Sequence, residues 1–321
     1  MQIDLLKTIG LLLIILAHVK PGYLLMQIRA FDVPLMILIS GYLAQASYKR
    51  ARTPFQYYLK RFLRLYIPTF LFLTFFFLFF YLTITPYPFT PKVIFRSFAL
   101  LFSNTINYVW IIRVFLLCAL LVPFLLHLQK YIFSKSGIVW LIVVFMYYEF
   151  DVSTPSFSEL YREIVFYGIG YGFVLILGMW LQYLSKKDIY KISILFGFIY
   201  CSIAIYLCYQ NGFYISVQQY KYPPRLYYLS YSISIGYFLF AITRKIKLKN
   251  TYPVIRFFSR YSLSIYLWHI FYLYLLKFYN LTAPWYLIYI GIVFFSCITS
   301  YLINKIFNKI CSLTIKFLLP K

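Results

Sequence analysis

Acidic side chains are scarce in this chain of 321 residues, which carries seven Asp and Glu, 31 Lys and Arg, and three histidines. No carboxylates are clustered as a divalent-metal site requires, and the sequence contains no HExxH, P-loop, nucleophile-elbow or dinucleotide-binding glycine pattern. The five cysteines show neither paired nor metal-ligand spacing, which indicates buried thiols. We therefore predict no bound metal and exclude the enzyme classes that these motifs define.

Apolar residues dominate what is present, since 63% of the chain is hydrophobic and only 12% is charged. A soluble domain is about half apolar, and the long apolar runs here are typical of membrane helices rather than of a β-barrel. We predict an all-α, polytopic membrane protein with about ten transmembrane helices. The predicted spans cover residues 3–19, 31–47, 67–85, 107–128, 137–150, 164–184, 189–208, 226–243, 260–279 and 284–304.

Lysine and arginine are distributed unequally between alternate loops. Segments 48–66, 129–136, 185–191 and 244–260, together with the C-terminal tail, hold 21 of them, whereas the intervening segments hold seven. The positive-inside rule assigns the richer side to the cytoplasm. We therefore expect a multi-pass protein of the plasma membrane with both termini cytoplasmic. The net charge of +24 then reflects topology, so we expect no nucleic-acid partner.

Three ionisable residues interrupt the first predicted span: Asp4, Lys7 and His18. Lys7 and His18 are eleven residues apart, so they share a helix face about 16 Å apart along the axis. Ionisable groups inside a span are costly and indicate a functional site. His18 is either a packed core histidine or a general base, and the shared face favours the base. Asp4 is a candidate partner of Lys7.

Basic residues near the predicted cytoplasmic boundary suit a phosphate-bearing ligand. Lys7 either snorkels to the interface or binds such a ligand. Arg61 and Arg64 are three residues apart in YLKRFLRLYIP and would face one way in a helix. Their guanidinium groups match phosphate oxygens in pairs. They are either ordinary positive-inside charge or a site for a ligand with several phosphates.

Polar residues in three other spans are further candidates. Asp32 begins the second span and either caps it or orients His18. Arg113 lies inside the fourth span, where it needs a partner or a wet cavity, and we expect it to bind a polar acceptor. Tyr266 and His269 belong to a polar stripe with Ser262 in the ninth span. This stripe either makes interhelical hydrogen bonds or binds substrate.

Four motifs, in order, resemble those of acyltransferase family 3, a family of integral-membrane proteins. IDLLKTIGLLLIILAHV is similar to the family's first helix, with a basic residue, ten spacers and a histidine. VPLMILISGYL resembles its second helix, YLKRFLRLYIP its Arg-x-x-Arg loop and SLSIYLWH its late Tyr-Leu-x-His helix. Two mild departures are Lys7, where arginine is commoner, and Met36-Ile37, which replaces an aromatic pair. The resemblance implies a single transmembrane acyltransferase domain over residues 1–321.

The resemblance also implies an activity, namely transfer of an acyl group, usually acetyl, from cytoplasmic acyl-CoA to a sugar hydroxyl. The acceptor would be a cell-envelope or exported polysaccharide or its lipid-linked precursor. Carried over by position, His18 is the catalytic base, and Lys7, Arg61 and Arg64 hold the CoA phosphates. The expected partners are thus membrane lipid, acyl-CoA as a donor substrate rather than a permanently bound cofactor, and a glycan acceptor.

Two alternatives stand beside this prediction. The first is a polysaccharide exporter or flippase, in which the same polar stripes line a conduit; it has no use for Arg61 and Arg64 aligned with an intramembrane histidine. The second concerns the chemistry, because Cys118 or Ser40 is a candidate nucleophile for an acyl-enzyme. We favour direct transfer to the acceptor.

Overall fold

The computed structural model describes residues 1–101, 103–152, 161–244, 246 and 251–318, and the secondary structure in these residues is helical. Side chains 162–163 and 306–318 lie outside this description. The elements are α1 (Gln2–His18), α2 (Tyr23–Ile28), α3 (Asp32–Tyr42), α4 (Ala44–Lys49), α5 (Pro54–Thr83), α6 (Pro91–Phe98), α7 (Trp110–His127), α8 (Gln129–Ile132), α9 (Lys135–Val152), the π-helix η1 (Arg162–Phe166), α11 (Tyr167–Trp180), α12 (Lys186–Asn211), the 3-10 helix η2 (Val217–Tyr220), α13 (Leu226–Thr243), α14 (Tyr252–Arg260), α15 (Ser262–Phe278) and α16 (Trp285–Leu318).

Each predicted span coincides with helix in the structure, and the protein is an all-α, polytopic membrane protein. Among the described residues, six helical segments are long and apolar enough to cross a membrane on length and composition alone. Helices α1 and α15 fall just below that length, with 17 residues each. The second predicted span is interrupted at Leu43, between α3 and α4.

The third span begins earlier than predicted, at Pro54 rather than at residue 67. Thr53 caps α5 by accepting a hydrogen bond from the Gln56 amide at 3.1 Å, and Pro54 occupies the first turn, where its missing N–H costs nothing. Arg61 and Arg64 therefore lie on the first turns of a spanning helix and not in a loop. Their spacing of three places them on one side of α5.

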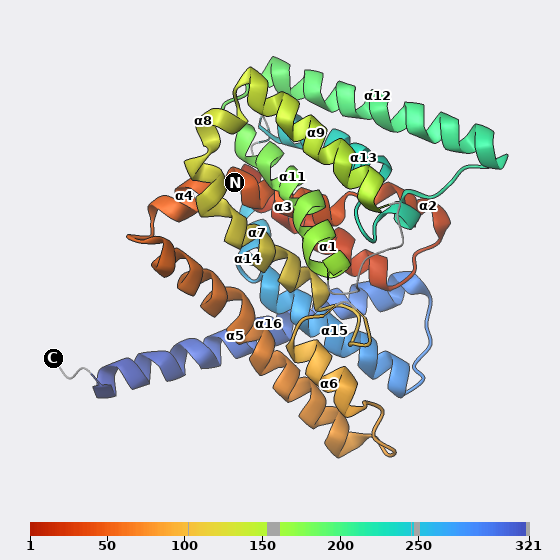
Figure 1. The fold of residues 1–321 in the computed structure, drawn as a ribbon. Helices are drawn as coiled ribbons and strands as arrows, with labels where there is room; N and C mark the ends of the chain where they lie inside the picture. The colour runs from red at the N-terminus through yellow and green to blue at the C-terminus, as the bar shows by residue number, and fades with distance from the viewer. Residues whose placement is uncertain (102, 153–160, 245, 247–250, 319–321) are drawn as a thin grey trace.

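Helix ends collect on two opposite sides of the molecule. In Figure 1, α4, α8 and the C-terminal end of α16 lie toward one side, whereas α2 lies at the other. The side with α4 and α8 is the one that carries the basic segments 48–66 and 129–136. This alternation is the arrangement that a chain crossing a membrane repeatedly has to adopt.

Helices α3 and α11 pack backbone to backbone through two glycines. A Cβ atom on Gly41 would lie 2.2 Å from the Leu175 carbonyl oxygen, and one on Gly178 would lie 2.2 Å from the Leu38 carbonyl oxygen. No side chain fits at either distance, so the approach depends on glycine at both positions. The contact fixes α3, which begins with Asp32, against the centre of the bundle.

Aromatic rings fasten α15 to α5. The Phe76 and Tyr274 ring centroids are 5.1 Å apart in a T-shaped arrangement, and those of Phe79 and Phe271 are 5.0 Å apart. Edge-to-face pairs at such distances contribute about 0.5–1.5 kcal/mol each beyond the burial of their area. This seam sets the rotation of α15 and leaves His269 directed toward α1.

Candidate active site

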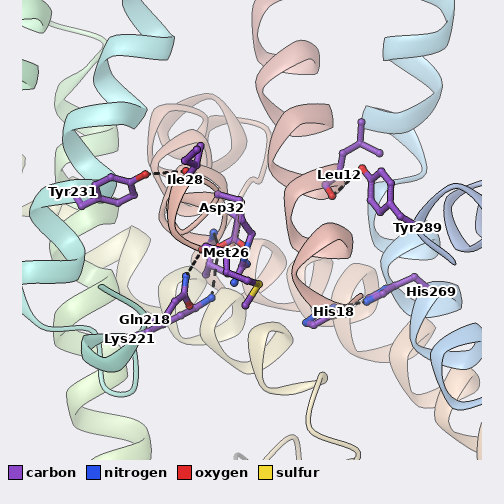
Figure 2. A network of polar contacts seen from close by, with 12 residues as sticks. Leu12, His18, Met26, Ile28, Asp32, Gln218, Lys221, Tyr231, His269 and Tyr289 are labelled. Atoms are coloured by element: carbon purple, nitrogen blue, oxygen red, sulfur yellow. Dashed lines mark hydrogen bonds and ion pairs between the residues drawn. The ribbon is translucent and has the colours of Figure 1, made fainter. Parts of the chain in front are cut away.

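Two histidines that are 251 residues apart in the sequence meet at the end of α1. His18 Nδ1 lies 2.9 Å from His269 Nε2, and the two rings are inclined by only 12° (Figure 2). His269 is completely buried, whereas His18 is partly exposed. One member of the pair is thus held inside the bundle, and the other is accessible.

The backbone decides which nitrogen of each ring carries a proton. His269 Nδ1 is hydrogen-bonded to the Tyr266 carbonyl oxygen, which can only accept, so Nδ1 must carry the hydrogen. In the neutral ring, His269 Nε2 is then unprotonated and accepts from His18 Nδ1. The remaining nitrogen, His18 Nε2, keeps its lone pair. The chain of bonds therefore gives His18 one available proton acceptor.

The segment between α6 and α7 covers one face of His18. The Tyr108 ring stands edge-on to His18 with centroids 4.5 Å apart. The Tyr266 hydroxyl donates a hydrogen bond to the Tyr108 carbonyl oxygen and so ties this segment to α15. Tyr266 thus has a positioning contact next to the histidine pair, and the substrate-binding role expected for it stays a prediction.

Asp32 contacts two cations rather than His18. Its carboxylate forms an ion pair with Arg29, a second one with Lys221 Nζ at 3.6 Å, and accepts the Val33 amide at 2.7 Å. All three ionised side chains are at most 5% exposed. The residue hydrogen-bonded to His18 is His269, so the structure does not give Asp32 the orienting contact that the sequence suggested. Asp32 lies in the first turn of α3, but the N-cap residue is Phe31 and no side-chain capping hydrogen bond forms there, so the alternative of a cap is not borne out either.

The structure brings Lys7, Arg61 and Arg64 together at the other end of α1. The charges of Arg61 and Arg64 both act on Lys7. The Arg61 guanidinium donates to Ser47 Oγ at 2.6 Å and lies 5.3 Å from the centre of the Tyr57 ring. Neither Lys7 nor Arg64 forms a hydrogen bond or ion pair in the described part of the chain, and Arg64 is exposed. Cations without partners at this spacing suit a polyanion.

Asp4 does not pair with Lys7. Its carboxylate lies 3.1 Å from the Met1 amino group and accepts hydrogen bonds from the Ser259 hydroxyl at 2.7 Å and the Tyr252 hydroxyl at 3.2 Å. Asp4 therefore fastens the start of α1 to α14. Lys7 therefore has no acidic side chain in contact with it among the described residues.

The other candidates lie elsewhere. Arg113 is buried near the start of α7, and its expected role in binding substrate stays a prediction. The Ser40 hydroxyl donates to the Met36 carbonyl of its own helix at 3.0 Å, and Cys118 is 2% exposed on α7. Among the residues that the structure describes, no three His, Cys, Asp or Glu side chains are grouped to hold a metal ion.

Sequence reasoning missed Arg29 and Lys221, which it counted only as loop charges. The available signal for Arg29 is its spacing of three from Asp32, which allows an ion pair on one helical turn. Lys221 stands in the non-helical turn before the two prolines of KYPPRLYYL, and its pairing with Asp32 joins residues 189 positions apart in the sequence. Nothing local indicates that this lysine is buried.

These features define a class: a polytopic helical membrane protein with a hydrogen-bonded histidine pair near one side and a cation cluster near the other. Residues 2–305 match a family model described as an acyltransferase domain. Because the match covers nearly the whole chain, the protein belongs to acyltransferase family 3, which confirms the resemblance of its motifs. Neither a search of curated proteins nor one of solved structures returns a match.

Proposed function

We propose that this family 3 acyltransferase moves an acetyl or other short acyl group from cytoplasmic acyl-CoA to a hydroxyl of a cell-envelope or exported polysaccharide, or of its lipid-linked precursor. The observation that carries the proposal is the bond chain from the Tyr266 carbonyl through His269 to His18. It leaves His18 Nε2 as a proton acceptor on a partly exposed ring. A hydroxyl nucleophile requires such a base.

In the proposed reaction, the acceptor oxygen attacks the thioester carbonyl carbon while His18 Nε2 takes the hydroxyl proton. The tetrahedral intermediate collapses with cleavage of the C–S bond, and the imidazolium returns the proton to the departing CoA thiolate. The products are the ester and free CoA thiol. His269 keeps His18 in one tautomer and orientation, and its Nε2 accepts the hydrogen bond from the transient imidazolium.

The donor would be held by the cation cluster of Lys7, Arg61 and Arg64. If the positive-inside rule orients the chain as expected, this cluster faces the cytoplasm. The phosphates of CoA would bind there, and the thin pantetheine arm would extend along α1. The distance from Lys7 to His18 along the axis is about 16 Å. The thioester would thereby reach the histidine while the nucleotide stays at the membrane surface.

Direct transfer is the simpler chemistry for this arrangement. The Ser40 hydroxyl is engaged by its own helix, and Cys118 is buried on α7. The described contacts of the His18 ring are with His269 and Tyr108, and neither candidate nucleophile is among them. A nucleophile that forms an acyl-enzyme has to lie within hydrogen-bond reach of its base.

The test uses purified full-length protein, radiolabelled acetyl-CoA and a panel of envelope glycans. His18→Ala should slow label transfer by about 10²–10⁴-fold, whereas His127→Ala should transfer normally, because His127 is an exposed histidine at the end of α7. Undiminished transfer by His18→Ala would rule out the proposed base. Glycan translocation into vesicles without label transfer by the wild type would instead support the exporter.

A further inference from the structure

A buried cluster beside the histidine pair carries more positive than negative charge. Arg29 and Lys221 share one carboxylate, that of Asp32, and all three residues are at most 4% exposed. Within the described residues, Asp32 is the one acidic side chain that forms an ion pair with either cation. The cluster therefore holds one positive charge that no carboxylate among the described residues balances.

The two cations, Arg29 and Lys221, retain hydrogen-bond donors for a ligand. Arg29 Nε is buried and has no hydrogen-bond partner in the described part of the chain. Lys221 Nζ has one carboxylate oxygen at 3.6 Å and two aromatic rings, Tyr222 and Tyr228, at 5.5 and 5.9 Å. Tyrosine faces attract a cation but bring no net charge. Burying an uncompensated charge is strongly unfavourable, so a protein has reason to keep one only where a ligand supplies the counter-charge.

The position of the cluster relative to His18 indicates what that ligand is. Figure 2 shows His18 between His269 on one side and Asp32 with Lys221 on the other. Arg29 and Lys221 lie near enough to His18 for their charges to influence it. The three donor-binding cations occupy the opposite end of α1. A negative group held by Arg29 and Lys221 would therefore belong to the molecule that brings its hydroxyl to His18.

Hydrogen bonds from side chains to backbone carbonyls hold the segments that carry the two cations. The Gln218 amide donates to the Met26 carbonyl oxygen at 3.2 Å, and the Tyr231 hydroxyl donates to the Ile28 carbonyl oxygen at 2.9 Å (Figure 2). These bonds join α2, which precedes Arg29, to α13 and to the segment that carries Lys221. Such preorganisation lowers the entropy cost of binding a ligand.

We infer that Arg29 and Lys221 form a subsite for a negatively charged group on the acceptor, either a carboxylate or a phosphate, so that the protein selects acidic glycans. The inference rests on the proposed function and adds to it a class of acceptor. Asp32 positions both cations and leaves one charge for the ligand. Discrimination arises because a neutral acceptor leaves that charge buried and uncompensated.

The first experiment uses the unmodified protein with labelled acetyl-CoA and three forms of one oligosaccharide. One form carries uronic carboxylates, the second has these carboxylates reduced to neutral alcohols, and the third carries phosphate monoesters on the neutral form. At least one anionic form should have a kcat/KM about tenfold or more above the neutral form, since hydrogen bonds to charged groups contribute about 1.5–3 kcal/mol. The anionic form with the higher kcat/KM shows whether the subsite prefers a carboxylate or a phosphate.

The second experiment removes the surplus charge without leaving an unpaired one. Lys221→Gln leaves the Arg29–Asp32 ion pair, which is neutral as a unit. The ratio of kcat/KM for the preferred anionic form to that for the neutral form should fall at least tenfold. Lys20→Gln is the matched control, because Lys20 is an exposed cation two residues beyond His18, and its ratio should stay at the wild-type value.

The possible results distinguish a failure of the proposed subsite from a failure of the proposed acyltransferase activity. Transfer to the neutral form at a rate equal to or above both anionic forms overturns the subsite but leaves the acyltransferase intact. The subsite is likewise overturned if the wild type prefers an anionic form and Lys221→Gln keeps that preference. Absence of label transfer to every form overturns the proposed function and the subsite together.

Discussion

The two polar regions along α1 differ in how completely their side chains are partnered. At the His18 end, His18, His269 and Asp32 each have fixed partners, and both His269 and Asp32 are at most 1% exposed. At the Lys7 end, Arg61 contacts Ser47 and Tyr57, whereas Arg64 is exposed and without a partner in the described residues. One region is rigid and built in advance; the other offers charge with freedom to move.

Under the proposed function, this difference corresponds to two tasks. Proton transfer requires atoms held within a few tenths of an ångström, because a base acts only within hydrogen-bond reach of its proton. Capture of a flexible polyphosphate needs charge and reach more than fixed geometry, and long side chains at a membrane surface supply both. If this contrast is correct, substitutions in the first region should act on kcat, and substitutions in the second should act on the KM for the donor.

The largest effect is expected for His18→Ala. Loss of a general base lowers the rate by about 10²–10⁴-fold, and kcat for label transfer should fall within that range. Donor affinity, measured by equilibrium binding of labelled CoA, should stay within twofold of wild type. A fall in CoA affinity that accounts for the lost activity would place His18 in donor binding and break the contrast.

His269 provides the next largest effect. His269→Ala removes the acceptor for His18 Nδ1, so kcat should decrease by about 10–100-fold, by analogy with the loss of a partner that orients a metal-bound histidine. His269→Gln supplies a carbonyl oxygen that can accept the same hydrogen bond and should recover part of the loss. Equal rates for the two variants, with unchanged thermal stability, would show that His269 only fills space.

Arg61→Ala and Arg64→Ala test the second region. Each should raise the KM for acetyl-CoA by about tenfold, as expected for one charge-assisted contact to phosphate, while kcat changes by less than threefold. Added salt should raise the wild-type KM as well, because exposed charges are screened. Lys49→Ala is a control, since Lys49 is exposed at the end of neighbouring α4. A kcat effect larger than the KM effect would contradict the assignment.

The smallest effect is expected for Asp4→Asn. The amide weakens the contacts to Met1, Ser259 and Tyr252, which should lower the free energy of unfolding by about 1 kcal/mol. Thermal melting in detergent measures this loss. The KM for acetyl-CoA should stay within twofold of wild type, because Asp4 is not paired with Lys7. A marked fall in KM would mean that Asp4 opposes donor binding.

Much of the fold follows from the sequence because membrane helices are encoded locally. Apolar runs located each spanning helix, and the eleven-residue spacing in α1 separated a histidine from a lysine on one face. The observed start of α5 lies at Pro54 and not at the predicted residue 67, because Thr53 and Pro54 begin a helix inside a polar segment. The basic residues of this segment suggested a loop, whereas its capping residues favour a helix.

The partners of the site residues could not be predicted in the same way. The contact between His18 and His269 and that between Asp32 and Lys221 join residues far apart in the chain, and each depends on how whole helices rotate. Asp4 illustrates the same limit on a smaller scale. Its nearest cation in sequence is Lys7, but the position of α14 provides closer hydroxyl groups.

The separation of the two histidines also has a consequence for biogenesis. His18 enters the membrane at the start of synthesis, but its partner lies 251 residues later. At a translation rate of about 5–20 residues per second, it waits roughly 10–50 s for α15. Until then, His18 lacks the group that fixes its tautomer. Under the proposed function, the nascent chain therefore lacks an oriented base until insertion is almost complete, and full activity would begin only then.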